Sequence, residues 1–530
     1  MRRAFFVAAL VVLAINAVCA FVYPPVCWSM ILFGPLIILG VRDALQTRHA
    51  VLRNFPVLGH FRYLFETIRP EINQYFIESD TDGRPFSREM RSLVYQRAKE
   101  VTDTVPFGTK EHVYDEGYEW VNHSLDPKHV DPETLRITIG GPDCTQPYTC
   151  SILNISAMSY GSLSSAAVKA LNGGARIGGF AHNTGEGGIS PHHLEKGGDL
   201  IWQIGTGYFG CRTAEGGFDP DLFAEGARQK SVKMIEIKLS QGAKPGHGGI
   251  LPASKLTPEL SAIRKVPMGK DVISPPAHTA FQGPEGLMRF VAQLRTLSGG
   301  KPVGFKLCVG KRREFFALCK AMLSTGITPD FITVDGAEGG TGAAPLEFSN
   351  HMGTPLAEGL ILVHNGLVGI GVRDKVKVLS AGRVMTGFDL IKRLALGADA
   401  CYSARAMMFA LGCIQALRCN SNHCPVGVAT QNPELVKGLH VGDKMQRVAH
   451  FHRNTVESAA EMVGAMGLHH SDDLRPWHVM RRVSPHEVHH YGELYDFLES
   501  GELLSAPVPD DYRRAWEAAQ AGSFDHANPD

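Results

Sequence analysis

The sequence predicts an α/β protein: a (β/α)8 TIM barrel preceded by an N-terminal transmembrane helical hairpin and a helical or irregular N-terminal extension. From about residue 136 onward, short apolar runs alternate with glycine-rich turns and helical stretches. Eight such runs are present, and eight parallel strands are the number that closes this kind of barrel. Near its start the chain also has an apolar segment that is long enough to enter a membrane.

The first 43 residues predict the hairpin. Residues 4–23 carry no charge and form a segment long enough to cross a hydrocarbon core of ~30 Å. Pro24 and Pro25 separate this segment from a second apolar run over residues 26–41. Arginines precede the first run and follow the second, so both ends are expected in the cytoplasm. The expected location is therefore the inner (cytoplasmic) membrane, with a cytoplasmic catalytic domain. A cleaved signal peptide over residues 2–20 and a second run that is only a surface helix remain alternatives.

Changes in composition along the chain divide it into four predicted units. The extension is rich in Arg, Phe, Tyr and Glu, which is typical of helices and loops, and it contains no catalytic motif that we recognise. One helix is expected from Ser87 to Ala98, with Ser87 as its N-cap. The units are the hairpin (1–43), the extension (44–135), the barrel (136–480) and a helical C-terminal tail (481–530).

Eight apolar runs are the expected barrel strands. They are Ser151–Met158, Gly178–His182, Leu200–Ile204, Lys233–Leu239, Pro302–Leu307, Phe331–Val334, Val376–Leu379 and Ala400–Ser403. The fourth and fifth are about 70 residues apart, and such an insertion normally lies on the catalytic rim. A doubly wound sheet is less consistent with the sequence, because Ser159-Tyr160-Gly161-Ser162 does not match the glycine-rich dinucleotide fingerprint.

The overall composition excludes several classes of protein. The 53 Lys and Arg balance the 53 Asp and Glu, whereas a nucleic-acid-binding protein needs a basic excess on one face, so no nucleic-acid partner is expected. With 44% hydrophobic residues the chain can bury a large core, which excludes a disordered protein. The 11 cysteines are too few for a disulfide scaffold, and the 57 glycines indicate many tight turns.

Three cysteines near the end of the barrel predict a metal centre. Cys413, Cys419 and Cys424 lie in one short segment, and Pro425 follows the last of them. Thiolates at such separations, with this proline, are typical of iron–sulfur clusters. Three thiolates without an obvious fourth favour a [3Fe-4S] cluster over a four-iron one. A zinc ion with His423 as fourth ligand and three unligated cysteines remain alternatives.

Several motifs together resemble the FMN-binding synthase domain of the glutamate synthase family. They are SAMSYGSLS (156–164), NTGEGG (183–188), IKLSQGAKPGHGG (237–249), DGAEGGTGAAP (335–345) and TGFDLIKRLALGADA (386–400). The cysteine run also resembles the three-iron loop of these enzymes. The combination is highly specific and covers residues 136 to 480. The chain as a whole is similar to shorter, membrane-tethered members of the family that lack the glutaminase domain.

The resemblance implies an FMN at the carboxyl ends of the strands. A cation is needed beside the N1–C2 edge of its ring, because reduction leaves negative charge there; Lys306 is the first candidate and Lys238 the second. Backbone and side-chain groups after the seventh and eighth strands are expected to bind the phosphate. These are Gly382, Arg383, Ala404 and Arg405. The other expected FMN contacts are Ala157, Met158, Ser159, Gln203, Gly340, Thr341 and Gly342.

Two segments depart from the larger glutamate synthases. Where those enzymes resemble D-G-G-x-K-T-G, this chain has AGRVMTG at 381–387, and it has Ala404 and Arg405 where they carry Gly-Thr. Both departures fall in the segments that are expected to bind the phosphate. His247 stands in KPGHGG where the larger enzymes carry a glutamate, in the region where ammonia arrives.

The reaction implied by the resemblance is the reduction of 2-oxoglutarate with ammonia to L-glutamate. Ammonia condenses with the keto carbon to give 2-iminoglutarate, which then takes a hydride from reduced FMN. Lys306 is the candidate proton donor, and Glu186 and Asp335 are candidates to order the amine. Ammonia would come from solution or from a partner. A different amine, such as methylamine, or a different 2-oxo acid is an alternative substrate.

The iron–sulfur cluster would pass single electrons from a donor to FMN. Ferredoxin, a partner subunit and a membrane carrier such as quinol are the donors that remain open, because no dinucleotide site is evident. The expected class is an oxidoreductase acting on CH–NH2 donors. A membrane-anchored electron-transfer subunit without turnover is the alternative function, and a homo-oligomer is left open.

Overall fold

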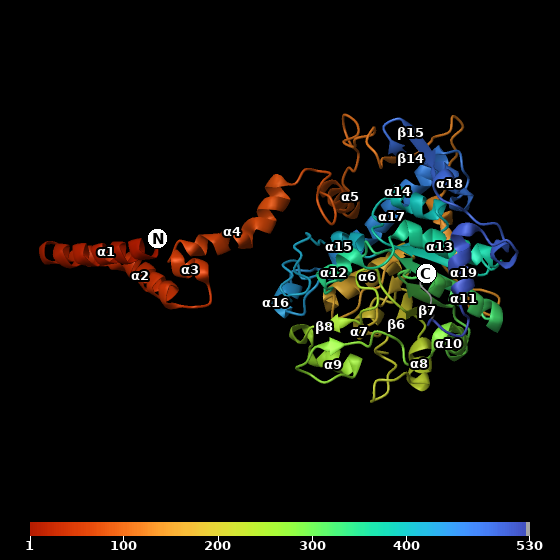
Figure 1. Ribbon diagram of the computed structural model, residues 1–530, viewed down its shortest axis with the longest axis horizontal. Helices are drawn as coiled ribbons and strands as arrows, with labels where there is room; N and C mark the ends of the chain where they lie inside the picture. Colours follow the sequence, from red (N-terminus) through yellow and green to blue (C-terminus); the bar gives the residue numbers. More distant parts are fainter. Residues whose placement is uncertain (526–530) are drawn as a thin grey trace. The chain divides into compact units, whose positions relative to one another are not determined.

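An eight-stranded parallel barrel forms the centre of the computed structural model, which describes residues 1–525 (Figure 1). Neighbouring strands are hydrogen-bonded in chain order, and the last pairs with the first. The strands are β4 (Leu153–Ile155), β5 (His182–Asn183), β6 (Leu200–Ile204), β7 (Val232–Lys238), β10 (Val303–Leu307), β11 (Phe331–Asp335), β12 (Lys377–Ala381) and β13 (Ala400–Ser403). The predicted (β/α)8 barrel is confirmed.

The first two barrel strands are shorter than the apolar runs that predict them. Gly178 still belongs to α6 (Ser165–Gly178), and Gly179 ends that helix with a φ of 63°, so the second strand begins only at His182. The first run is divided because Ser151 ends β3 (Tyr148–Ser151), which pairs antiparallel with β2 (Arg136–Ile139). In both cases, residues that the apolar run predicts as part of a barrel strand belong instead to the preceding element, α6 or β3.

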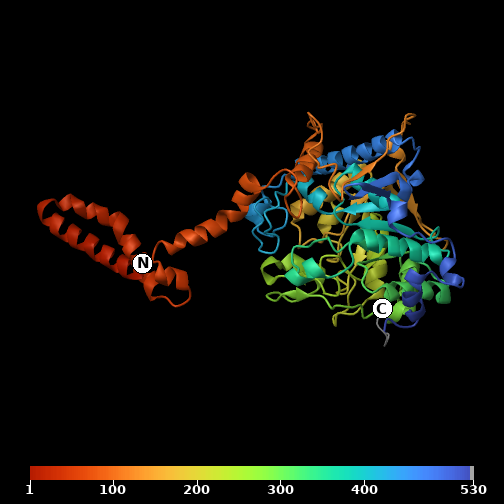
Figure 2. The same ribbon diagram turned by 45° about the horizontal axis from the view of Figure 1, so that its top comes forward.

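A helix follows each barrel strand on the outside of the barrel (Figure 2). In chain order these helices are α6, α7 (Pro191–Leu194), α8 (Pro220–Ala227), α10 (Gly283–Leu297), α11 (Arg312–Thr325), α13 (Leu356–Gly369), α14 (Gly387–Ala395) and α17 (Val441–Ala465). Trp202 of β6 stacks on Phe223 of α8 with ring centroids 5.2 Å apart, which shows how strand and helix share one apolar layer. α17 packs against both α6 and α14, so the last helix completes the outer ring.

Insertions between the barrel elements and a C-terminal tail add further helices and strands to this barrel. The long insertion begins at the carboxyl end of β7 and contains β8 (Ile250–Leu251), α9 (Pro258–Arg264) and β9 (Val272–Ile273). Short helices α12 (Leu346–His351), α15 (Arg405–Ala410) and α16 (Pro433–Val436) lie in the later loops. β14 (Val479–Ser484) joins β1 (Glu119–Val121) and β15 (Glu487–His490) in a small antiparallel sheet. α18 (Tyr491–Leu494) and α19 (Asp510–Ala518) follow, and α19 packs on α11.

The chain divides into two compact units, Met1–Arg88 and Glu89–Asp530. In the first unit, α1 (Arg2–Val22) and α2 (Met30–Leu45) form a hairpin around the 3-10 turn Pro24–Ser29. By length and composition, Arg2–Val22 and Pro24–Leu45 suffice to cross a membrane. α3 (Ala50–Asn54) and α4 (Gly59–Ile72) follow. The helix predicted from Ser87 is α5 (Arg88–Lys99).

Candidate functional site

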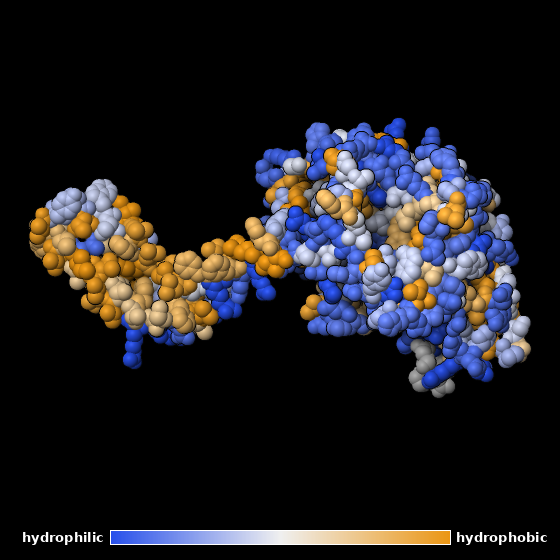
Figure 3. Space-filling view, turned by 90° about the horizontal axis from the view of Figure 1, so that it is seen from above, coloured by the Kyte–Doolittle hydropathy of each residue, from blue (hydrophilic) through white to orange (hydrophobic). Residues whose placement is uncertain are grey.

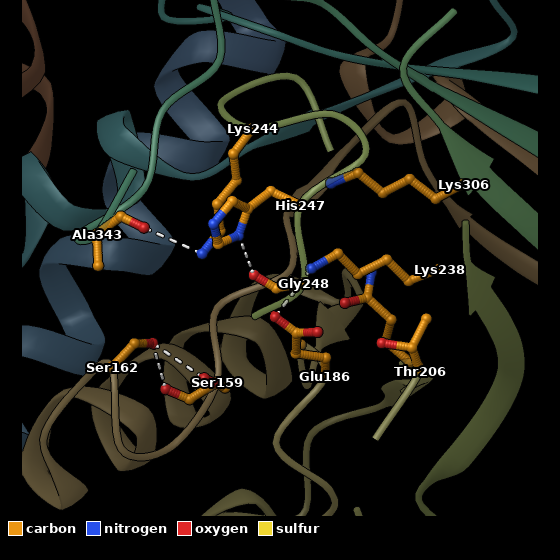
Figure 4. Close-up of polar contacts among 12 residues, drawn as sticks. Ser159, Ser162, Glu186, Thr206, Lys238, Lys244, His247, Gly248, Lys306 and Ala343 are labelled. Atoms are coloured by element: carbon orange, nitrogen blue, oxygen red, sulfur yellow. Dashed lines mark hydrogen bonds and ion pairs between the residues drawn. The ribbon is translucent and has the colours of Figure 1, made fainter. Parts of the chain in front are cut away.

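Two buried ion pairs lie at the carboxyl ends of neighbouring barrel strands. Lys238 ends β7, and Lys306 is its register partner on β10. Lys238 Nζ lies 2.8 Å from Glu186 Oε1, and Lys306 Nζ lies 3.1 Å from Asp335 Oδ2. In Figure 4 both lysines extend in the same direction from their strands. The four residues named from the sequence as charged groups of the site therefore lie together.

The surroundings of these pairs favour the charged forms of Lys306 and Glu186. Burial opposes the charge of Lys306, but Asp335 and Glu236 outweigh it, so the pKa of Lys306 is raised. Burial also opposes the charge of Glu186, but Lys238 and other nearby cations outweigh it, so the pKa of Glu186 is lowered. At neutral pH the site thus presents a fixed ammonium and a fixed carboxylate at the end of the barrel.

A fully buried carboxylate, Glu236, lies two residues before Lys238 on the same strand. It accepts hydrogen bonds from Asn183 Nδ2 (2.8 Å), Gln203 Nε2 (2.7 Å) and Thr333 Oγ1 (2.7 Å). Residues i and i+2 of a strand share one face, so Glu236 and Lys238 both face the barrel interior. Sequence reasoning named Gln203 but missed the other three residues. The charged residue inside the apolar run IEIKL was the signal that could have identified Glu236.

The loop after β7 reaches over the ion pairs. Gly242 N donates to Asp335 Oδ2 (3.0 Å), and Lys244 Nζ donates to the carbonyl oxygen of Ala343 (3.0 Å; Figure 4). A Cβ on Gly249 would lie 2.5 Å from Glu186 Oε1, so a larger residue there would displace the Glu186 carboxylate. His247 packs edge-on against Phe348, with ring centroids 5.4 Å apart. The loop therefore shields the pairs from water on this side.

The loops after β4 and β5 form the opposite side of the site. Gly185 has a φ of 65°, and a Cβ there would lie 2.6 Å from the backbone nitrogen of Ser159. Arg264 of α9 donates to the carbonyl oxygen of Tyr160 (3.0 Å) and also lies near Glu186. The insertion is thus fixed onto the segment that contains the expected ring contacts. Met158 is buried, whereas Ala157 and Ser159 are partly exposed.

The expected phosphate residues gather after β12 and β13. Arg405 is the first residue of α15, and burial lowers its pKa, with the charge of Arg383 acting in the same direction. Arg405 lies so close to Gly340 that a Cβ on that glycine would be 1.2 Å from Arg405 Nη2. Arg383 (φ 47°) has a left-handed backbone conformation next to Gly382. Two neighbouring arginines beside Gly340 and Gly382 are suited to an anion.

The three predicted cluster ligands lie between α15 and α16. Burial, together with the nearby thiols of Cys419 and Cys424, raises the pKa of Cys413 to about 12. Lys255 and Arg405 are near enough to interact electrostatically with these thiols. Within residues 1–525, no three His, Cys, Asp or Glu side chains are grouped as they would be around a single metal ion.

The remaining residues near the cysteines bear on the choice of metal. His423, the alternative zinc ligand, is exposed. A Cβ on Gly342 would lie 3.4 Å from Cys419 Cβ, so the loop after β11 approaches the cysteine segment closely. In that loop, Thr341 is exposed. Ala404, which follows β13, caps α15 without a side-chain hydrogen bond. A donor set of three thiols with adjacent cations fits an iron–sulfur cluster better than zinc.

Comparisons with known proteins match more than half of the chain. A family model described as the conserved region in glutamate synthase matches residues 132–469. The glutamate synthase large subunit-like protein YerD of Bacillus subtilis (strain 168) is 36% identical over 509 residues, which cover 88% of this chain and 96% of YerD.

Other matches are more partial. The archaeal-type glutamate synthase (NADPH) of Thermotoga neapolitana is 35% identical over 333 residues, so the match spans 62% of this chain and 62% of that protein. Among solved structures, a flavocytochrome b2 double mutant with pyruvate bound is 14% identical, with a TM-score of 0.42, and the match covers 83% of this chain and 92% of that one.

Proposed function

The chain belongs to the glutamate synthase family, and from this premise we propose that it is a flavin-dependent oxidoreductase that forms an amino acid from a 2-oxo acid and an amine. The principal reaction is that of 2-oxoglutarate with ammonia, giving L-glutamate. The observation that carries the proposal is the pair of buried ion pairs, Lys238 with Glu186 and Lys306 with Asp335, at the end of a closed barrel. This arrangement supplies both a cation and carboxylates where barrel enzymes place their chemistry.

The residues around these pairs fit FMN. Arg383 and Arg405, which lie close together after β12 and β13, would bind its phosphate through their guanidinium groups. Lys306 would lie beside the ring edge that gains negative charge. Gly340 permits the close approach that a larger residue would block. When bound, FMN supplies the hydride that reduces the substrate.

The protein groups then act on the substrate. The overall reaction consumes 2-oxoglutarate, ammonia, two electrons and two protons, and it produces glutamate and water. Glu186 and Asp335 are carboxylates that accept N–H hydrogen bonds, so they orient the amine. Lys306 holds a proton at Nζ and is the group placed to donate one. The loop containing Gly242 and Gly249 limits the access of water, which protects the imine from hydrolysis.

Electron supply is the role proposed for the cysteine segment. Cys413, Cys419 and Cys424 would hold a [3Fe-4S] cluster, which stores single electrons between an external donor and the flavin. Lys255 and Arg405 would stabilise the negative charge of such a cluster. The donor is ferredoxin, a partner subunit or a membrane carrier. We also propose that α1 and α2 anchor the chain in the inner membrane, which their length and composition support.

Rapid mixing of the reduced protein tests the function. The full chain is purified anaerobically in detergent, reduced, and mixed with 2-oxoglutarate and either ammonia or methylamine, while flavin absorbance is followed. Reoxidation of the flavin with ammonia supports the proposal. Reoxidation only with methylamine would identify methylamine, in place of ammonia, as the amine substrate. Failure of every 2-oxo acid and amine to reoxidise the flavin would overturn it and leave an electron-transfer subunit.

The cluster gives a separate prediction. Cys419→Ser removes one of the three proposed ligands, so we expect iron and acid-labile sulfide to fall to a small fraction of the unaltered protein's content while FMN remains. The matched control is Cys144→Ser, at a half-buried cysteine whose Sγ donates to the carbonyl oxygen of Gly300 (3.3 Å), a contact that a hydroxyl reproduces. Equal iron contents in the two variants would contradict the assignment.

A further inference from the structure

α4 presents an apolar face that the proposed reaction does not use. Its large apolar residues recur every three or four positions, so they lie on one side of the helix. They are Phe61, Leu64, Phe65, Ile68 and Ile72. Phe61, Leu64 and Phe65 are 53%, 52% and 59% exposed, and the rings of Phe61 and Phe65 stack with centroids 6.5 Å apart. A continuous exposed apolar stripe of this kind marks a binding surface.

The other side of α4 is polar and charged. Arg62 Nη2 and Glu66 Oε1 form an exposed ion pair of 2.9 Å, and Thr67 and Arg69 are exposed as well. α4 continues into the π-helical turn Asn73–Ile77, and it carries four charged residues, Arg62, Glu66, Arg69 and Glu71, which are costly inside a hydrocarbon core. A helix that is apolar on one side and charged on the other is typical of one that lies in a membrane interface.

A buried aspartate fixes where α4 begins. Asp43, near the end of α2, is 3% exposed and accepts hydrogen bonds from Val57 N (3.0 Å) and His60 Nε2 (2.9 Å). The first turn of α4 is therefore held beside the end of α2. If α2 ends at the membrane surface, where Arg42 lies, then α4 starts at the level of the lipid headgroups.

The charge of the connecting segment agrees with that location. Arg42, Arg48 and Arg53 lie between the apolar part of α2 and α4, with Asp43 as the only acidic residue from 42 to 58. Basic residues just outside a span are attracted to the anionic lipids of the cytoplasmic leaflet. Figure 3 shows hydrophobic residues covering the hairpin and continuing along the helix that follows it.

We propose that α4 lies in the membrane interface, parallel to the bilayer surface, with its Phe61–Ile72 face among the lipid acyl chains. The proposal rests on the membrane hairpin proposed above, and it adds a third, non-spanning contact between this chain and lipid. The chain then leaves the membrane at the end of α4 and not at the end of α2.

Tryptophan probes in the full chain test this orientation. Phe65→Trp places the probe on the apolar face, and Thr67→Trp places the matched control on the polar face; both variants keep the five native tryptophans as a common background. Each variant is reconstituted in vesicles of phosphatidylcholine and phosphatidylglycerol, with or without brominated acyl chains. We expect bromine to quench the added emission of Phe65→Trp several-fold more than that of Thr67→Trp, and aqueous iodide to show the reverse order.

Three results would overturn the proposal. The first is equal bromine quenching in both variants. The second is iodide quenching of Phe65→Trp that equals or exceeds that of Thr67→Trp. The third is shielding of Phe65→Trp from both quenchers together with cross-linked dimers, which would assign the face to a second copy. Carbonate extraction tests the hairpin separately. If the chain resists carbonate extraction but the Phe65→Trp probe is not quenched by bromine, the membrane hairpin is supported and the α4 proposal is overturned. If carbonate releases the chain but bromine still quenches the Phe65→Trp probe in floated vesicles, the hairpin is overturned and the location of α4 at the interface is supported.

Discussion

Lys306 and Lys238 are register partners on adjacent strands, but their surroundings differ. Lys306 has two carboxylates acting on it, Asp335 and the buried Glu236, and together they raise its pKa despite burial. Lys238 contacts Glu186, which is also near Arg264 and Lys244. Two carboxylates stabilise the charge of Lys306, whereas Lys238 shares Glu186 with other cations. Lys306 is therefore the cation best suited to stabilise a reduced flavin.

Replacing Lys306 by methionine removes this charge with little change in volume. We expect kcat to fall by about 10²–10³-fold and the reduction potential of the bound flavin to become more negative, because charge that develops during reduction loses its partner. A potentiometric titration together with steady-state rates measures both. Lys311→Met, at an exposed lysine in the loop after the same strand, is the matched control. An unchanged potential in Lys306→Met would show that another group carries this role.

Glu236 is expected to act by positioning other groups. Glu236→Gln keeps the shape but turns an amide nitrogen toward at least one of its three donors, Asn183, Gln203 and Thr333. Leaving a buried donor without an acceptor costs about 1–3 kcal/mol, so the unfolding midpoint in urea should fall accordingly. The pH dependence of turnover should also shift toward lower pH, because Lys306 loses a nearby carboxylate. Glu225→Gln on the exposed side of α8 should change neither quantity.

At the scale of elements, the barrel could be predicted because apolar runs and glycine turns follow from chain geometry alone. Each of the eight runs overlaps a barrel strand, the second only at His182. The residues at the carboxyl ends of the strands, such as Lys238 and Lys306, meet as parallel strands require. The family resemblance is likewise confirmed. The partners of Glu236 could not be predicted, because they depend on the stagger between β5, β6, β7 and β11, which no local pattern encodes.

The loop after β7 gives a prediction at this scale. A Cβ on Gly242 would lie 1.7 Å from the carbonyl oxygen of Gly336, so Gly242→Ala must separate the loops after β7 and β11 and break the bond from Gly242 N to Asp335. We expect a loss of about 1–3 kcal/mol in unfolding free energy, as for other overpacked sites, and weaker FMN binding measured by fluorescence titration. Gly310→Ala, which meets no atom within 4 Å, is the control; equal FMN affinities would contradict the packing argument.

At the scale of the whole molecule, closure of the barrel depends on segments far apart in the sequence. α17 places His452 against the first strand, where its Nε2 lies 2.9 Å from Ser151 Oγ and 3.0 Å from the carbonyl oxygen of Leu153. The His452 ring stacks on Phe180 with centroids 3.9 Å apart. Burial lowers the pKa of His452 to about 3, with the charge of Arg136 acting in the same direction.

This burial makes the stability of the barrel depend on pH. An unfolded histidine binds a proton below about pH 6.5, whereas buried His452 remains neutral until about pH 3, so its contribution is complete above the unfolded pKa and is lost as the pH falls. From about pH 7 to about pH 5 this removes about 2 kcal/mol of unfolding free energy. His452→Gln retains a donor for the carbonyl oxygen of Leu153 but does not titrate, so urea unfolding of this variant should lose about 2 kcal/mol less over the same interval. His486→Gln, at an exposed histidine, should retain the full pH dependence, and identical slopes for the two variants would show that His452 is not the group responsible.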